Sequence, residues 1–250
     1  MARSPRRSVS RRSATTGPSL NSARDVSEAD VVELYKEVVG QTRHVVSRHI
    51  MEKLGLEAAL IPLMPQYAAR EPAEVLTALR LSFYEAFIAD DAVLRENRWP
   101  YTVHLVRMAK KSGCRIALAT SSLTAEAKRV LRALDLEQEF DAVVGLDQVR
   151  QGKPNPEIYL TAAGRLGVPP VDCLVIEDSP PGVVAALAAG MNVIGVATPF
   201  THLGLHAPGL IDHQWIVHDP ELLLETVNRR IEQHNHPAEP DPEDDRSLRT

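Results

Sequence analysis

Apolar residues in the first part of the chain recur at the three- to four-residue spacing of amphipathic helices. Ser27 followed by Asp30 predicts a helix start of the capping-box kind, with Asp in place of the usual Glu, and Gly40 predicts the end of that helix. The same spacing predicts a second helix and a longer third one over Glu74–Ile88. We therefore expect an all-helical domain over residues 25–100.

From residue 101 onward the period changes to short apolar runs that alternate with helices of about ten residues. Such alternation is typical of a parallel sheet wrapped by helices, and strands without polar alternation are typical of a sheet covered on both faces. The predicted strands are 115–120, 142–145, 173–177 and 192–196, and the last predicted helix is 220–231. The fold class is therefore α/β, with its core over residues 101–232.

The composition is that of an ordinary globular protein, with 44% hydrophobic and 24% charged residues among 250. No apolar stretch approaches the roughly 18 residues that indicate a membrane span. The net charge of -5 disfavours nucleic acid as a partner. Cys114 and Cys173 cannot form a disulfide framework, and both are predicted to be reduced core residues of a cytoplasmic protein.

The two ends of the chain differ in composition from the rest. Residues 1–24 contain six arginines and no acid. A transit peptide, a twin-arginine signal and a basic arm for nucleic acid are alternatives, but a secretion signal needs an apolar stretch after the arginines and none follows. The composition favours a disordered leader, and the proline-rich, acidic residues 233–250 are predicted to be a disordered tail.

Ligands of an open parallel sheet bind beyond the carboxyl ends of its strands, so the residues that follow each strand are candidate site residues. Thr120 and Ser121 follow the first predicted strand and precede a helix, where hydroxyls and free amides favour a phosphate. The alternative is that these residues only cap the helix.

Two further candidates follow later strands. Lys153 lies in a loop stiffened by prolines and is a candidate counter-charge to phosphate, or alternatively an exposed loop lysine. Glu177 and Asp178 end an apolar strand, and adjacent carboxylates at such a position suit Mg²⁺. The alternative for Asp178 is that it caps the next helix.

Taken together, these segments resemble the motifs of the haloacid dehalogenase-like superfamily, and the nearest subgroup is the β-phosphoglucomutase-like phosphatases with a helical cap. ALATSS resembles the second motif, GKPNPEIY the third and VIEDSPPGVVAALAAGM the fourth. The resemblance implies a Rossmann-like sheet with the helical domain as its cap, and a small phosphorylated metabolite such as a sugar phosphate as substrate. It implies that Thr120 binds the transferring phosphoryl group, that Lys153 neutralises it, and that Asp178 holds Mg²⁺ with Glu177 as a neighbouring or alternative ligand.

The first motif of that family, an apolar strand followed by Asp-x-Asp-Gly, is absent from the sequence. It should fall near residues 10–20, which read SRRSATTGPSL. Its first aspartate supplies the nucleophile and its second the general acid and base, so we expect weak turnover and a weakened Mg²⁺ site. Two hypotheses remain: a phosphoester hydrolase or phosphomutase by family, with an altered start, and a non-catalytic module that binds a phosphorylated ligand or a protein partner.

His202 and His206 are four residues apart, with His213 and His218 nearby. Gly204 and a following proline are predicted to interrupt any helix there, and no Cys or acid completes the set. The sequence therefore disfavours a zinc site at this position.

Overall fold

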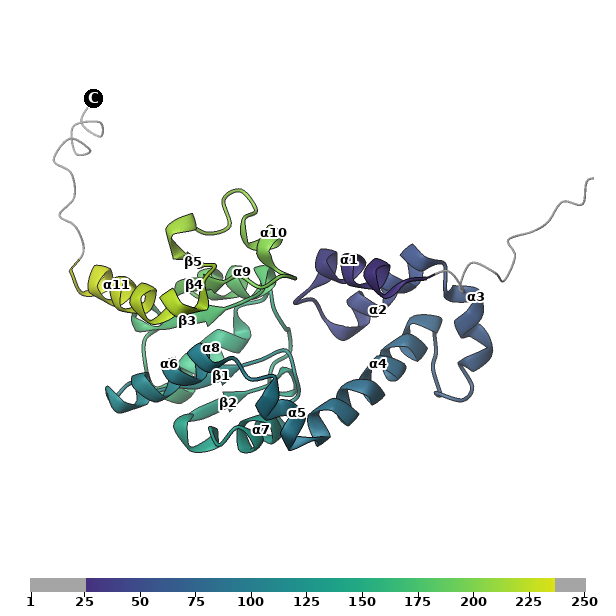
Figure 1. Ribbon diagram of the computed structural model, residues 1–250, viewed down its shortest axis with the longest axis horizontal. Helices are drawn as coiled ribbons and strands as arrows, with labels where there is room; N and C mark the ends of the chain where they lie inside the picture. Colours follow the sequence, from purple (N-terminus) through teal and green to yellow (C-terminus); the bar gives the residue numbers. More distant parts are fainter. Residues whose placement is uncertain (1–25, 237–250) are drawn as a thin grey trace, which may run out of the picture.

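The computed structural model describes residues 26–236, which form a helical domain beside an α/β domain (Figure 1). The predicted leader, residues 1–24, and the stretch in which the first family motif is expected lie outside the described residues. The predicted tail lies outside them except for residues 233–236.

The helical domain begins as the sequence predicts. Helix α1 (Glu28–Val38) starts with a capping box, in which the Asp30 amide donates to Ser27 Oγ at 3.2 Å and the Ser27 amide donates to Asp30 Oδ2 at 3.0 Å. The other helices of this domain are α2 (Arg43–Leu54), α3 (Glu57–Leu60), η2 (Ile61–Leu63), α4 (Pro72–Ala89) and α5 (Asp91–Glu96). Helices α3 and α5 were not predicted, because elements of four and six residues are too short to display a helical period.

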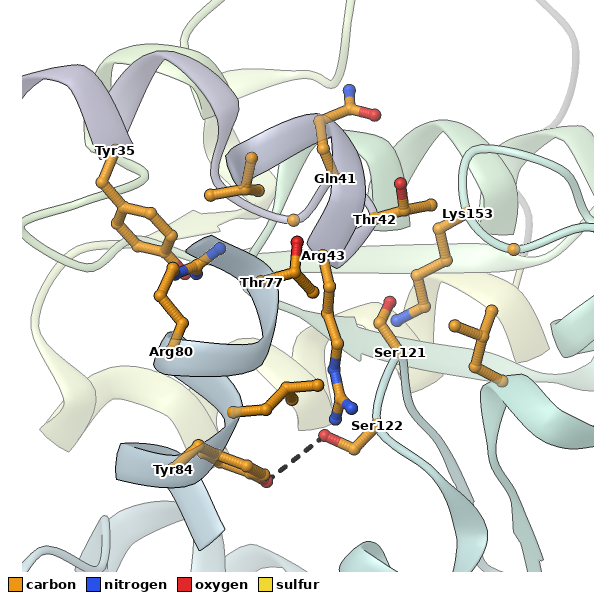
Figure 2. A pocket seen from close by; sticks show the side chains of 15 residues that line it. Tyr35, Gln41, Thr42, Arg43, Thr77, Arg80, Tyr84, Ser121, Ser122 and Lys153 are labelled. Carbon is orange, nitrogen blue, oxygen red and sulfur yellow. Dashed lines mark hydrogen bonds between the residues drawn. The ribbon is translucent and has the colours of Figure 1, made fainter. Parts of the chain in front are cut away.

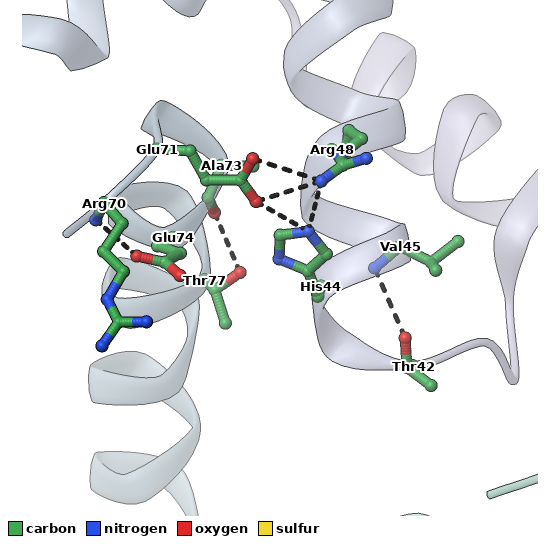
Figure 3. A network of polar contacts seen from close by, with 9 residues as sticks. All are labelled: Thr42, His44, Val45, Arg48, Arg70, Glu71, Ala73, Glu74 and Thr77. Atoms are coloured by element: carbon green, nitrogen blue, oxygen red, sulfur yellow. Dashed lines mark hydrogen bonds and ion pairs between the residues drawn. The ribbon is translucent and has the colours of Figure 1, made fainter. Parts of the chain in front are cut away.

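Two sets of contacts hold α2 and α4 together. Their apolar faces meet in a small core that includes Met51 and Val75. At one end of this core, Arg48 donates to both oxygens of Glu71, at 3.0 and 3.2 Å, and His44 Nε2 lies 2.8 Å from the same carboxylate (Figure 3). The helices of this domain therefore have a packed interior of their own.

The five strands of the α/β domain are all parallel, as predicted, but they form two sheets in the described residues. Strand β1 (Ala117–Ala119) pairs with β2 (Ala142–Val144), and β4 (Asn192–Val196) pairs with both β3 (Leu174–Glu177) and β5 (Ile216–Val217). The family resemblance implies a single sheet in which the strand that carries the missing first motif lies between the strands ending at Thr120 and Glu177. Strands β1 and β3 both end at the candidate site, and no backbone ladder joins them within residues 26–236.

Helices cover both faces of the larger sheet. The helices of the α/β domain are α6 (Pro100–Lys111), α7 (Thr124–Ala133), α8 (Glu157–Leu166), α9 (Pro180–Ala188), α10 (His202–Leu205) and α11 (Leu223–Asn235), with short η3 (Glu137–Glu139), η4 (Leu146–Gln148), η5 (Pro170–Asp172), η6 (His213–Trp215) and η7 (Pro220–Leu222). In β4, Val193 belongs to the apolar cluster of α8 and α9, and the next residue, Ile194, belongs to the cluster of α6 and α11. Burial on both faces explains why this strand has no polar alternation.

Two details differ from the sequence predictions. Helix α11 continues to Asn235, so residues 233–235 are helical and do not belong to a disordered tail. Cys114 is exposed and Cys173 is half-buried, so the prediction that both are core residues is wrong, although both are free thiols. Among residues 26–236, no helix combines the length and the apolar character needed to cross a membrane.

Candidate active site

A buried ion pair joins two of the predicted site residues. Lys153 Nζ lies 3.0 Å from Glu177 Oε2, and the two residues are only 7% and 8% exposed. The same ammonium donates to the carbonyl of Ala119, the last residue of β1, at 3.3 Å. Lys153 therefore connects the ends of β1 and β3, and the alternative of an exposed loop lysine is wrong.

Glu177 accepts hydrogen bonds at both of its oxygens. Tyr159 Oη donates to Oε2 at 2.8 Å, and the backbone amide and hydroxyl of Ser179 donate to Oε1. Burial, followed by the charge of Glu177, raises the pKa of Tyr159 far above its ordinary value, so the phenol stays a neutral donor. With the ion pair to Lys153, both oxygens of Glu177 are used inside the protein.

The chain approaches Glu177 closely at Gly182, in the first turn of α9. A Cβ at this position would lie 1.8 Å from Glu177 Oε1, so a larger residue here would displace the carboxylate. The side chain of Ser179 caps this helix by accepting from the Gly182 amide at 3.3 Å. The alternative interpretation of Asp178 as the helix cap is therefore wrong.

Asp178 follows Glu177 at the end of β3, but its exposure and its hydrogen bonding differ from those of Glu177. Its side chain is exposed, and no side chain of the described residues donates to its carboxylate. The protein atoms crowded around it raise its pKa, the charge of Glu177 raises it further, and Lys153 opposes both effects. Asp178 thus has carboxylate oxygens open to a ligand, whereas Glu177 does not.

Thr120 and Ser121 lie just beyond β1. The Thr120 amide continues the ladder by donating to the Val144 carbonyl at 3.0 Å, and Thr120 Oγ1 accepts from the Ser122 amide at 3.1 Å. Helix α7 begins three residues later, with Leu123 at its N-cap, so neither Thr120 nor Ser121 caps it. The structure places both residues beside the strand end that Lys153 contacts.

Above these strand ends, a cavity of about 260 Å³ opens between the helical domain and the α/β domain. Ser121, Ser122 and Lys153 line it from the core, and Arg43 and Arg80 line it from α2 and α4. Figure 2 shows side chains from both domains around this space, with Lys153 beside Ser121 and Arg43 beside Ser122. The cavity wall contains three cationic side chains and no carboxylate, so it favours an anionic ligand.

The two arginines differ in their partners. Arg43 forms a 2.5 Å ion pair with Glu126 of α7, which ties the helical domain to the core. Arg80 donates to the hydroxyl of the fully buried Ser47 at 3.2 Å and has no carboxylate partner within residues 26–236. Burial lowers the pKa of Arg80, Tyr35 opposes this effect, and Arg43 lowers the pKa further, but a guanidinium remains charged at neutral pH. Arg80 is therefore a cation whose compensating anion the described residues do not supply.

Sequence reasoning missed Arg43, Arg80 and Tyr159. The two arginines lie on helical faces that resemble solvated ones in the sequence, and no local pattern distinguishes them. Tyr159 had a usable signal, since it lies six residues after Lys153, near the start of the helix that the same segment predicts.

A family model for haloacid dehalogenase-like hydrolases matches residues 6–190 of the chain. The chain is 41% identical over 133 residues to a bifunctional riboflavin kinase/FMN phosphatase of Arabidopsis thaliana, which covers 52% of this chain and 35% of the relative. It is 46% identical over 102 residues to a phosphorylated carbohydrates phosphatase of Thermotoga maritima, covering 41% of this chain and 46% of that one. The chain therefore spans less than half the length of these two curated relatives.

Solved structures agree on the fold. The β-phosphoglucomutase of Clostridium difficile superposes with a TM-score of 0.62 at 22% identity, over 81% of this chain and 82% of that one. A putative β-phosphoglucomutase from Thermotoga maritima superposes with a TM-score of 0.52 at 28% identity, over 79% and 82% of the two chains. The α/β core with a helical cap is thereby confirmed, and the chain belongs to the haloacid dehalogenase-like hydrolases.

Proposed function

We propose that this protein binds the phosphoryl group of a small phosphorylated metabolite, such as a sugar phosphate, between its cap and its core. The observation that carries the proposal is the buried Lys153–Glu177 pair, which fixes an ammonium at the floor of a cavity without carboxylates in its wall. Ser121 and Thr120 supply hydroxyls beside it. Relatives named as phosphatases of phosphorylated carbohydrates and hexitols support this substrate class.

The cap gives the proposal its second element. Arg80 lies on the cap side of the cavity without a carboxylate partner in the described residues, so an anionic or hydroxyl-rich part of a ligand can reach it while the phosphoryl group meets Lys153. The two cations lie on different domains, so a ligand that contacts both favours the closed arrangement of cap and core.

We further propose that Asp178 is the carboxylate that binds Mg²⁺. Magnesium is usually held by one or two carboxylates together with water and substrate phosphate oxygens, and Asp178 fits this donor set. Glu177 fits it poorly because both of its oxygens already accept hydrogen bonds, so its role is to position Lys153. When bound, the ion neutralises charge on the phosphoryl oxygens.

Hydrolysis by the chain as written is expected to be slow. Thr120, Lys153 and Asp178 can position a phosphoryl group, but the sequence contains no Asp-x-Asp-Gly run to supply a nucleophile and an acid-base group. The alternative function is a module that binds a phosphorylated ligand without turning it over. Both functions predict binding, and only the first predicts turnover after the missing aspartates are restored.

Binding is tested by titrating the protein with a panel of phosphorylated sugars and inorganic phosphate in the presence of Mg²⁺. We expect saturable binding that is weakened about tenfold or more in Arg80→Met, because a charge-assisted hydrogen bond contributes roughly 1.5–3 kcal/mol. The matched control is Lys128→Met, which removes an exposed cation of α7 outside the cavity. Equal affinity of both variants for every ligand would contradict the proposed site.

Turnover is tested with a generic aryl phosphate and Mg²⁺. The unmodified chain is compared with one in which an apolar strand ending in Asp-x-Asp-Gly replaces residues 1–24. Activity that appears only in the repaired chain, and is lost again in Asp178→Asn, supports a hydrolase whose nucleophile is missing. Robust turnover by the unmodified chain would show that another carboxylate serves, and binding without turnover in either chain favours the non-catalytic module.

A further inference from the structure

Four histidines that do not line the phosphoryl cavity gather in the segments that follow β4 and flank β5. His202 and His206 come from α10 and its C-cap, and His218 follows β5. One ring nitrogen from each of these three lies within 4.8 Å of the other two. The ring centroids of His213 and His206 are 4.7 Å apart, so a fourth imidazole lies next to the group.

The sequence disfavoured a metal site here because no Cys or acid completes the set and because Gly204 and Pro208 were expected to interrupt any helix. For Gly204 that prediction is wrong: Gly204 lies within α10, and the His206 amide donates to the His202 carbonyl at 3.3 Å. This turn brings both imidazoles to one side of the helix. Gly204 is needed for packing, since a Cβ there would lie 2.6 Å from Pro180 Cγ at the start of α9.

We infer that His202, His206 and His218 form a binding site for a divalent transition-metal ion of the Zn²⁺ class, distinct from the Mg²⁺ position at Asp178. The Nε2 atoms of His206 and His218 lie 3.2 Å apart. Two nitrogens bound tetrahedrally to one Zn²⁺ at 2.0–2.1 Å are about 3.3 Å apart, so this pair needs little movement to share an ion. Imidazole nitrogen suits Zn²⁺, Ni²⁺ and Cu²⁺, whereas Mg²⁺ prefers oxygen.

The backbone that carries these imidazoles is held by buried neighbours. Thr201 and Leu205, beside the two helical ligands, are 1% and 0% exposed, and Thr201 Oγ1 lies 2.9 Å from Thr198 Oγ1. Val217, next to His218, is 3% exposed. The ligand positions are thus set by the sheet and its covering helix, which is the arrangement that preorganises a metal site.

The surroundings give the three imidazoles no other partner of opposite charge. Within residues 26–236, the histidines that pair with a carboxylate are His44, His49 and His234, and all three lie elsewhere. A bound cation would give these ring nitrogens a shared partner, which no carboxylate of the described residues does.

A bound ion would connect the segment after β4 to the segment after β5. The same β4 segment contacts the cap, because the ring of Phe200 packs edge-on against Tyr35 of α1 with 6.0 Å between centroids. Figure 1 shows α10 facing α1 across this boundary. The ion would therefore stiffen the part of the core against which one cap helix rests.

The test titrates Zn²⁺ into the full chain without a histidine tag, with Mg²⁺ in excess to occupy the carboxylate site, and follows binding by calorimetry. We expect one equivalent to bind, and His206→Ala and His218→Ala each to weaken binding about tenfold or more. His104→Ala, which removes an exposed histidine of α6 outside the cluster, and Asp178→Asn should bind as the unmodified chain does. Co²⁺ should give the visible bands of a tetrahedral nitrogen site in the unmodified chain and in His104→Ala, and lose them in His206→Ala.

Three results would overturn the inference. They are the absence of Zn²⁺ binding by the unmodified chain, unchanged binding in both cluster variants, and loss of binding in Asp178→Asn. The last result would assign the ion to the phosphoryl site. Circular dichroism of each metal-free variant shows whether it is folded, and the two cluster variants lie on different segments, so one remains informative if the other fails to fold.

Discussion

Removal of one partner from the buried Lys153–Glu177 pair should destabilise the core strongly. Glu177→Gln keeps the side-chain volume but leaves the Lys153 ammonium, 7% exposed, without its counter-charge. An uncompensated buried charge of this kind costs about 3–5 kcal/mol. Because a domain of this size is stable by only about 5–15 kcal/mol, the variant should unfold at a much lower urea concentration.

Lys153→Met should be milder than Glu177→Gln. The carboxylate left behind still accepts from Tyr159 and Ser179, so its desolvation is partly compensated. We expect a loss of about 1–3 kcal/mol, the usual cost of one missing partner. The double variant removes both charges at once, and its loss should fall short of the sum of the single losses by roughly 0.5–3 kcal/mol.

The assay is urea unfolding of the four proteins without ligand, followed by far-ultraviolet circular dichroism. Lys110→Met, which opens the exposed Lys110–Asp141 pair, is the matched control and should shift the midpoint little, because exposed pairs contribute little. Additive losses, or a Glu177→Gln variant within about 1 kcal/mol of the unmodified chain, would refute the view that this pair is an energetically coupled, buried unit.

Two further predictions concern the cap and the surface. Gly40 has φ +84°, and a Cβ there would lie 2.7 Å from Ser179 Cβ. Gly40→Ala should therefore push the cap away from the core and weaken the binding of a sugar phosphate, as measured by calorimetry. The control is Gly55→Ala, which changes a glycine that also has a positive φ but has open space around it. The hydrogen bond from Lys110 lowers the pKa of Asp141 below its ordinary 3.8, and the hydrogen bond from the Ile116 amide lowers it further. The charged carboxylate therefore stabilises the fold at pH values above about 4. This stabilisation is lost as the pH falls through the lower pKa of the folded state. Asp141→Asn should therefore be slightly less stable than the unmodified chain at about pH 7, and the difference should shrink as pH falls through the folded-state pKa. A difference that persists unchanged into acid would contradict this.

Local patterns were sufficient for the long elements. The period of three to four apolar residues, with Ser27 and Gly40 as boundaries, located the first cap helix, and the apolar run of β4 matched the strand residue for residue. They failed for α10 and β5, which have four and two residues. An element so short contains less than one period of its own pattern, and the surrounding core holds it in place.

The candidate site, like the fold, could be predicted from the sequence only in part. Strand ends followed by Thr120, Lys153 and Glu177–Asp178 are visible in the sequence, because parallel strands deliver their carboxyl ends to one edge. The sequence left open which of two adjacent carboxylates is buried: Glu177 meets Lys153, 24 residues away, while Asp178 faces outward.

The surroundings of Arg80 and the contact between His206 and His218 depend in the same way on distant neighbours. Arg80 lines the cavity only because α4 packs against α2, and His218 reaches His206 only because β5 pairs with β4. Helical and strand periods report contacts between residues two to four apart. The charge partner of a buried group and the third ligand of a metal site depend instead on how separate elements pack, since only packing brings together residues far apart in sequence and removes water from between them.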